Sequence, residues 1–189
     1  MDGLRLVRPD EAMEAQAQEY VREHREWGES ELHGSALLEQ RAYADWLRLR
    51  GDNASPATVR PGWVVASTFF VVRQGDGRLI GMADIRHDLN DFLRKFGGHI
   101  GYGVRPSERR KGYGAQILQM ALDYGAAIGL NRAMVACYTT NEASRRTILR
   151  CGGVLERENQ QADGRWVQVY WITLGDTAAA GPACEVTGE

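Results

Sequence analysis

Residues 101–130 read GYGVRPSERRKGYGAQILQMALDYGAAIGL, and this stretch decides the fold. It begins like the end of a strand, continues as a short basic loop and ends with the pattern of a helix. The apolar stripe of that helix consists of Ile117, Leu118, Ala121, Leu122, Tyr124 and Ile128, which recur at helical spacing. Gly129 suits the C-terminal cap. We therefore predict a strand, a loop and a helix in that order.

The loop of this unit has the features of an anion site. Backbone N–H groups at a helix N-terminus, together with the helix dipole, attract phosphate groups. Gly112 and Gly114 have no Cβ, so the backbone can turn sharply and a ligand can come close. Four cations and one anion, Glu108, lie between Arg105 and Lys111. The alternative is a glycine-rich turn that binds nothing, and we disfavour it because these cations would then crowd one turn without a counter-ion.

Other phosphate-binding patterns do not fit the loop. A Walker-type loop needs GxxxxGK followed by Ser or Thr, and no such string occurs. A dinucleotide-binding fingerprint would need a third glycine where Ile117 stands. What remains is Arg109-x-x-Gly112-x-Gly114, placed after a strand and before a helix.

Composition limits the class of protein. The chain has 189 residues, 43% of them hydrophobic and 25% charged, which suits a single globular domain with a sizeable core. We expect no membrane span and no signal segment. Three cysteines without a pattern favour a reducing cytoplasm. The net charge of −2 argues against a general nucleic-acid binder.

Hydrophobic periodicity and turn residues predict the remaining elements. Helices are expected from Pro9 onward, through Leu38 to Leu49, and from a Thr139 capping box to Cys151. A loop is expected over 51–61, and a short turn over 88–98 with Phe92 packed inward. The predicted strands are 4–7, 63–73, 79–87, 99–104, 133–138, 154–160 and 165–174. Residues 175–189 are expected to form a disordered tail.

The loop pattern Arg109-x-x-Gly112-x-Gly114 resembles the acyl-CoA pyrophosphate loop of the GNAT family, the Gcn5-related N-acetyltransferases. Asn141-x-x-Ser144, followed by Gly152-Gly153, resembles a second family segment, with Val154 in place of its usual Phe. The predicted order β-α-α-β-β-β-α-β-α-β-β is that of the GNAT fold. The resemblance implies one α/β (α+β) domain over residues 1–174, with a mixed central sheet of about seven strands and helices on both faces.

The resemblance also implies an activity: transfer of an acetyl group from acetyl-CoA to a primary amine by direct attack in a ternary complex. Strands 99–104 and 133–138 would splay apart after a bulge at Gly101 and Gly103, and the pantetheine arm would lie in the gap. The implied cofactor-binding residues are Tyr102, Gly103, Val104, Arg109, Arg110, Lys111, Gly112, Tyr113, Gly114, Ala115, Asn141 and Ser144. Asn141 could instead cap its own helix.

The chemistry of the transfer is less well marked in the sequence. Many family members place a tyrosine acid seven residues after the Asn, and Ile148 stands there. Tyr138, His99 and Tyr102 are the catalytic candidates, with packing roles as the alternative. The missing tyrosine also leaves open a non-catalytic module that binds or senses acyl-CoA. The expected partner is a small-molecule or peptide amine, with no metal, nucleic acid or membrane, and the chain is expected to be a monomer or homodimer.

Overall fold

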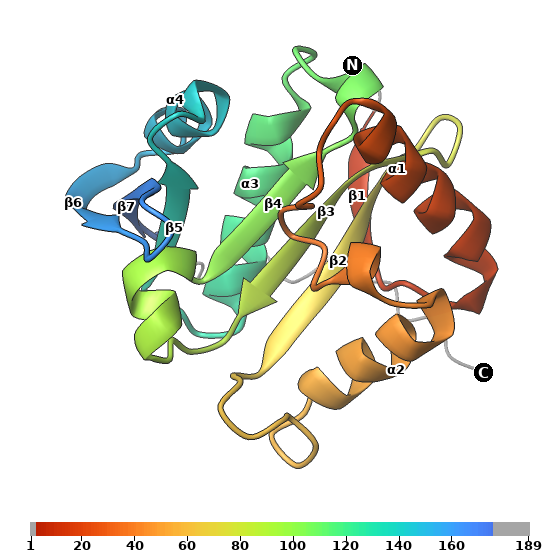
Figure 1. Ribbon diagram of the computed structural model, residues 1–189, viewed down its shortest axis with the longest axis horizontal. Helices are drawn as coiled ribbons and strands as arrows, with labels where there is room; N and C mark the ends of the chain where they lie inside the picture. Colours follow the sequence, from red (N-terminus) through yellow and green to blue (C-terminus); the bar gives the residue numbers. More distant parts are fainter. Residues whose placement is uncertain (1–2, 176–189) are drawn as a thin grey trace.

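Seven strands form one mixed sheet in the computed structural model, which describes residues 3–175 (Figure 1). The strands are β1 (Leu4–Val7), β2 (Ala66–Arg73), β3 (Leu79–Arg86), β4 (Ile100–Val104), β5 (Arg132–Tyr138), β6 (Val154–Gln160) and β7 (Trp166–Thr173). Their spatial order is β1-β2-β3-β4-β5-β7-β6. Only β4 and β5 are parallel neighbours among these strands. The predicted tail, apart from Gly175, lies outside the described residues.

Helices cover both faces of the sheet, as predicted. The helices are α1 (Glu14–Glu26), α2 (Tyr43–Asn53), α3 (Tyr113–Ala127) and α4 (Glu142–Arg150). Side chains alternate along β2, so Phe70 packs with Trp46 of α2 while Phe69 packs in the core that contains Ile117 of α3. Figure 1 shows α1 and α2 on one side of the sheet and α3 on the other.

The sheet opens between β4 and β5. These two strands share a single register pair, Ile100 with Val135, and then diverge. The closed end is held by His99: its N–H donates to the Met134 carbonyl (2.7 Å), and its Nδ1 accepts from the Met134 N–H (2.9 Å). The predicted splay of the two central strands is therefore present.

The bulge predicted in β4 is wrong. β4 pairs with β3 without a register shift from Val104 to Ile100. The glycines of β4 instead leave room for the backbone of the α1–α2 connection, which lies directly against the strand. A Cβ on Gly103 would meet the His33 carbonyl oxygen at 2.6 Å, and one on Gly34 would meet the Cα of Tyr102 at 2.7 Å. Two backbones approach where side chains are missing.

Three local predictions are also corrected. The helical pattern from Leu38 breaks into a 3₁₀ turn (Leu38–Gln40) and α2, which runs on through Asn53 into the predicted loop. Asn141, not Thr139, caps α4, because its Oδ1 accepts the Ser144 N–H at 3.0 Å. Phe92 is 62% exposed rather than packed inward, whereas Leu93 and Phe96 of the same turn pack against the core.

Candidate functional site

A cleft of about 1890 Å³ occupies the opening between β4 and β5. One end, which we call the α3 end, is formed by the loop 109–115 and by residues 141–150 of α4 and its cap. The other end, the α2 end, is formed by the segment 27–37, the last turn of α2, and residues on β2, β3 and the loop 90–97. The cleft thus draws on both faces of the sheet.

The N-terminus of α3 faces this cleft. Gly112 is its N-cap with φ +83°, a conformation that favours glycine, and Arg110 also has a positive φ of 65°. The first amides of a helix have no intrahelical acceptor. Residues 112–115 all line the cleft, so these amides lie at the wall of the α3 end.

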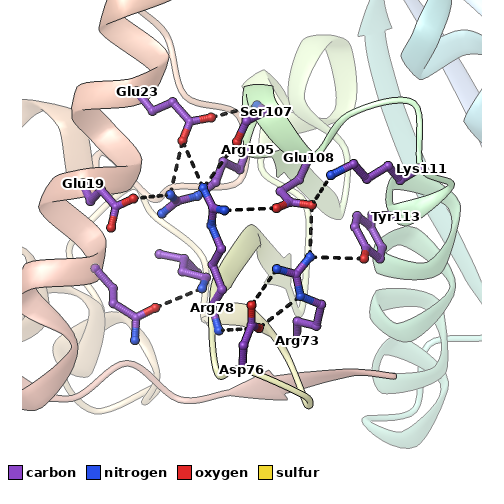
Figure 2. A network of polar contacts seen from close by, with 12 residues as sticks. Glu19, Glu23, Arg73, Asp76, Arg78, Arg105, Ser107, Glu108, Lys111 and Tyr113 are labelled. Atoms are coloured by element: carbon purple, nitrogen blue, oxygen red, sulfur yellow. Dashed lines mark hydrogen bonds and ion pairs between the residues drawn. The ribbon is translucent and has the colours of Figure 1, made fainter. Parts of the chain in front are cut away.

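Three of the loop's four cations, Arg105, Arg109 and Lys111, have carboxylate counter-ions, which the charge argument from the sequence did not include. The Arg105 side chain is only 1% exposed and pairs with Glu19 (2.7 Å) and Glu23 (3.2 Å) of α1. Figure 2 shows that it belongs to a continuous network linking α1, the β2–β3 hairpin and the loop. The argument from cations crowded without a counter-ion therefore fails for Arg105, because carboxylates far away in the sequence balance its charge.

Glu108 forms the second centre of this network (Figure 2). Its carboxylate is 4% exposed and contacts Lys111 (2.8 Å), Arg73 (3.1 Å) and Arg78 (3.3 Å). Burial opposes ionisation, yet these cations together hold the pKa of Glu108 below its usual value. The loop is thereby tied to the hairpin, and Lys111 is held away from the cleft wall.

The Arg109 side chain also binds a carboxylate of the protein, whereas the motif implies that it binds the cofactor. Its guanidinium binds both carboxylate oxygens of Glu29 (2.5 and 2.7 Å), and its Nε donates to the Val104 carbonyl (3.1 Å). Arg109 holds the pKa of Glu29 down at about 2, so the pair stays ionised at neutral pH. The side chain joins the segment 27–37 to the loop at the start of α3.

The remaining implied cofactor residues are brought together. All of them except Lys111 line the cleft. The Tyr102 hydroxyl lies 3.1 Å from the Ser144 Oγ, which connects β4 with α4. Burial raises the pKa of Tyr102 to about 12, so its hydroxyl keeps its proton at neutral pH. Within residues 3–175 the Arg110 guanidinium makes no ion pair. Arg150 adds positive charge to the same end, while Arg146 there pairs with Glu142 (2.8 Å).

The structure separates the three catalytic candidates. Tyr138 lines the cleft at the end of β5, with the Arg165 guanidinium 4.4 Å from its ring centroid. Burial raises the pKa of Tyr138, so its hydroxyl is protonated at neutral pH. Tyr102 lines the cleft as well. His99 does not: it holds the closed end of the β4–β5 opening, and burial lowers its pKa to about 4, so the ring is neutral there.

The α2 end contains polar groups that no short motif marks. Asp84 is buried, accepts a hydrogen bond from Thr68 Oγ1 (2.8 Å) and forms an ion pair with Arg86 (3.1 Å). Arg50 and Asn53 of α2 line the same space. Only the strand positions of Thr68 and Asp84, opposite each other in the sheet, could have indicated this cluster.

Neither a membrane span nor a metal centre emerges from the described part of the chain. None of the helices within residues 3–175 has the length and apolar character needed to cross a bilayer. In the same residues, no group of three or more His, Cys, Asp or Glu side chains could hold a metal ion.

Comparison with curated proteins and solved structures finds acetyltransferases. An uncharacterized N-acetyltransferase, YoaA of Bacillus subtilis, is 31% identical over 78 residues, which are 35% of this chain and 44% of that protein. The chain thus spans less than half the length of this curated relative.

Two solved structures share the fold. RimL, a ribosomal L7/L12 alpha-N-protein acetyltransferase in complex with coenzyme A, is 19% identical with a TM-score of 0.67, over 92% of this chain and 95% of that one. The putative acetyltransferase yncA of Salmonella typhimurium, with its cofactor acetyl-CoA, is 16% identical with a TM-score of 0.62, over 96% and 99%.

The family profile described as acetyltransferase (GNAT) matches residues 38–152, which include β2 to β5, the loop before α3 and the Asn141 segment. The match therefore covers well over half of the chain and both segments on which the resemblance rested. Together with the seven-stranded sheet that opens between β4 and β5, it shows that this chain belongs to the acetyltransferase (GNAT) family.

Proposed function

We propose that this protein transfers an acetyl group from acetyl-CoA to a primary amine by direct attack within a ternary complex. The observation that carries the proposal is the cleft through the opened sheet. It has free helix amides at one end and a separate, polar end on the opposite face. Such a cleft allows two substrates to enter from different sides and meet between β4 and β5.

The residues of the α3 end suit an acyl-CoA. The amides of 112–115 and the positive end of the α3 dipole would hold the pyrophosphate. Arg110, Arg146 and Arg150 would balance the phosphate charge. The pantetheine arm would pair with the free edge of β4 as an added strand. Solved relatives of the same fold contain coenzyme A or acetyl-CoA, which supports this placement.

The chain's own groups would then assist the transfer. Acetyl-CoA supplies the activated thioester carbonyl. A backbone N–H of β4 near Tyr102–Val104 would polarise that carbonyl as negative charge develops on its oxygen. We assign to the Tyr138 hydroxyl the donation of a proton to the departing thiolate. Ile148, at the family's usual tyrosine position, is fully buried and has no acidic proton to donate.

The acceptor amine has to lose its own proton before it attacks. A lysine-like amine with a pKa near 10.4 is neutral in only about one molecule in 10³ at neutral pH. We propose that the acceptor is a small-molecule or peptide amine and that it enters through the α2 end. We also propose a cytoplasmic location, consistent with Cys137 and Cys151 being free thiols.

Release of free thiol from acetyl-CoA tests the function directly. The purified chain is supplied with acetyl-CoA and a panel of peptides, amino acids, polyamines and aminoglycosides. We expect turnover on at least one amine, with the acetylated product identified by mass spectrometry. Tight acetyl-CoA binding with no turnover on any acceptor would instead support the non-catalytic acyl-CoA-binding module.

A further inference from the structure

Two buried polar atoms at the α2 end have no partner within residues 3–175. They are the Nε of Arg50, a donor, and the Oδ1 of Asn53, an acceptor. Asn53 is only 6% exposed, and both residues line the cleft from the last turn of α2. A buried polar group without a partner carries a desolvation cost, so this site is incomplete without a ligand.

The charge of Arg50 has no ion-pair partner among the described residues, in contrast to two other arginines that line the cleft. Arg86 pairs with Asp84 at 3.1 Å, and Arg165 pairs with Glu31 at 3.3 Å. No carboxylate of the described residues lies within ion-pair distance of Arg50. Two contacts fix its side chain: it donates to the Pro9 carbonyl (3.2 Å), and its guanidinium lies 5.8 Å from the Trp46 ring centroid. A fixed, partly buried cation facing a cleft is suited to an oxyanion.

The position of this pair sets the length of a suitable ligand. α2 packs on β2 through the stacked rings of Trp46 and Phe70, and β2 is two strands away from β4. Neighbouring strands lie about 4.8 Å apart, so β2 is roughly 10 Å from β4 within the sheet, and the pair lies on the helix packed over β2. An extended peptide advances about 3.4 Å per residue, so at least three residues are needed to cover this spacing within the sheet.

We infer that the acceptor is a short peptide whose free C-terminal carboxylate binds Arg50 and whose last amide N–H donates to Asn53 Oδ1. This rests on the proposed transferase function and names its substrate class. A peptide C-terminus satisfies both unpartnered atoms at once, because it carries an N–H donor next to an oxyanion. A polyamine would instead bring a second cation toward Arg50.

Triglycine and triglycinamide are the matched probes, since they differ only in the charge of the C-terminus. In the thiol-release assay we expect kcat/KM to favour triglycine by about tenfold to a hundredfold, the range typical of a hydrogen bond to a charged group. Arg50→Gln should abolish that preference. Arg48→Gln is the control, because Arg48 lies on the same helix but is 74% exposed and pairs only with Asp45. It should keep the full preference.

A second variant keeps the inference testable if Arg50→Gln does not fold. Asn53→Asp places a carboxylate of nearly the same shape beside Arg50 and should reverse the preference toward triglycinamide. Equal rates for the two peptides, or a preference that survives in both variants, would overturn the inference. Faster turnover of 6-aminohexyl phosphate than of either peptide would overturn the peptide assignment and leave an oxyanion site of another class.

The failure of this inference can be distinguished from the failure of the proposed function. If no amine is acetylated, calorimetry measures triglycine binding to the protein loaded with coenzyme A. Binding that Arg50→Gln weakens at least tenfold, and Arg48→Gln does not, would support the carboxylate site even without turnover. Absence of triglycine binding to the wild-type chain would overturn it.

Discussion

The two ends of the cleft are built in opposite ways. The α3 end comes from one continuous stretch of chain and α4 and presents backbone amides. Three cations of its loop are paired with Glu23, Glu29 and Glu108. The α2 end is assembled from segments far apart in the sequence and leaves Arg50 and Asn53 with unpartnered atoms. A site for a shared cosubstrate can be satisfied by backbone geometry alone. A site that selects one acceptor needs side chains that stay incomplete until the acceptor arrives.

The largest effect should follow from disrupting the backbone at the α3 end. Gly112→Asp introduces a side chain at φ +83° and a negative charge beside the free amides of α3. We expect coenzyme A affinity to fall by about 100-fold or more, measured by calorimetry on folded protein.

A glycine at the other end of the same helix gives the control. Gly129 also has a positive φ (+94°) and, like Gly112, open space around a new Cβ. Gly129→Asp therefore repeats the backbone strain and the charge away from the cleft, and coenzyme A affinity should change less than threefold. Equal losses in both variants would mean that strain, not the anion site, is responsible.

Between the two ends, Tyr138→Phe tests the acid. The variant removes only the hydroxyl, and general acid assistance is typically worth about 10²- to 10⁴-fold. We expect kcat to fall about 100-fold while acetyl-CoA affinity stays level. Tyr170→Phe is the comparison, because the Tyr170 hydroxyl donates a hydrogen bond to Gln168 (2.7 Å) and its ring is buried in the core. This variant should keep kcat within about threefold of the wild type. A similarly small loss for Tyr138→Phe would make Tyr138 a packing residue.

The smallest effect should come from the link between the ends. Glu29→Gln weakens the pair with Arg109, and we expect a loss of about 1 kcal/mol in the free energy of unfolding. The pKa of Glu29 is lowered from 4.5 to about 2, so its contribution is complete above pH 4.5 and disappears as the pH falls toward 2. Urea titrations at pH 7 and pH 2.5 should therefore show a clearly smaller difference in the free energy of unfolding between the wild type and the variant at the lower pH. A difference that persists unchanged at pH 2.5 would contradict this assignment.

The elements that could be predicted from the sequence are those that depend on residues close together in the chain. The helical stripe from Ile117 and the loop at Gly112 follow from local spacing, and the structure has both where they were expected. Asn141 was given two possible roles, and the local one, capping of α4, is present. The element order follows from the same kind of pattern, because periodicity and turn residues are short-range signals.

The sequence failed where the answer depends on contacts between distant residues. Arg109 pairs with Glu29, which lies eighty positions away in the sequence, and Arg105 pairs with Glu19 of α1. No spacing rule indicates either pair. The glycines of β4 were interpreted as a bulge because the segment that lies against them could not be foreseen. Arg50 and Asn53 resemble ordinary helix residues until the fold brings them beside the opened sheet.

The single rung between β4 and β5 has a consequence for the protein without its cosubstrate. β1 to β4 form one continuous set of paired strands and β5 to β7 another, and the seam between them is closed mainly by the Ile100–Val135 pair and the His99 bonds. A cosubstrate arm that pairs with the free edge of β4 would act as a removable eighth strand in this seam. The melting temperature of the protein would then rise with the concentration of its cosubstrate, so the stability of the fold would depend on how much cosubstrate is available.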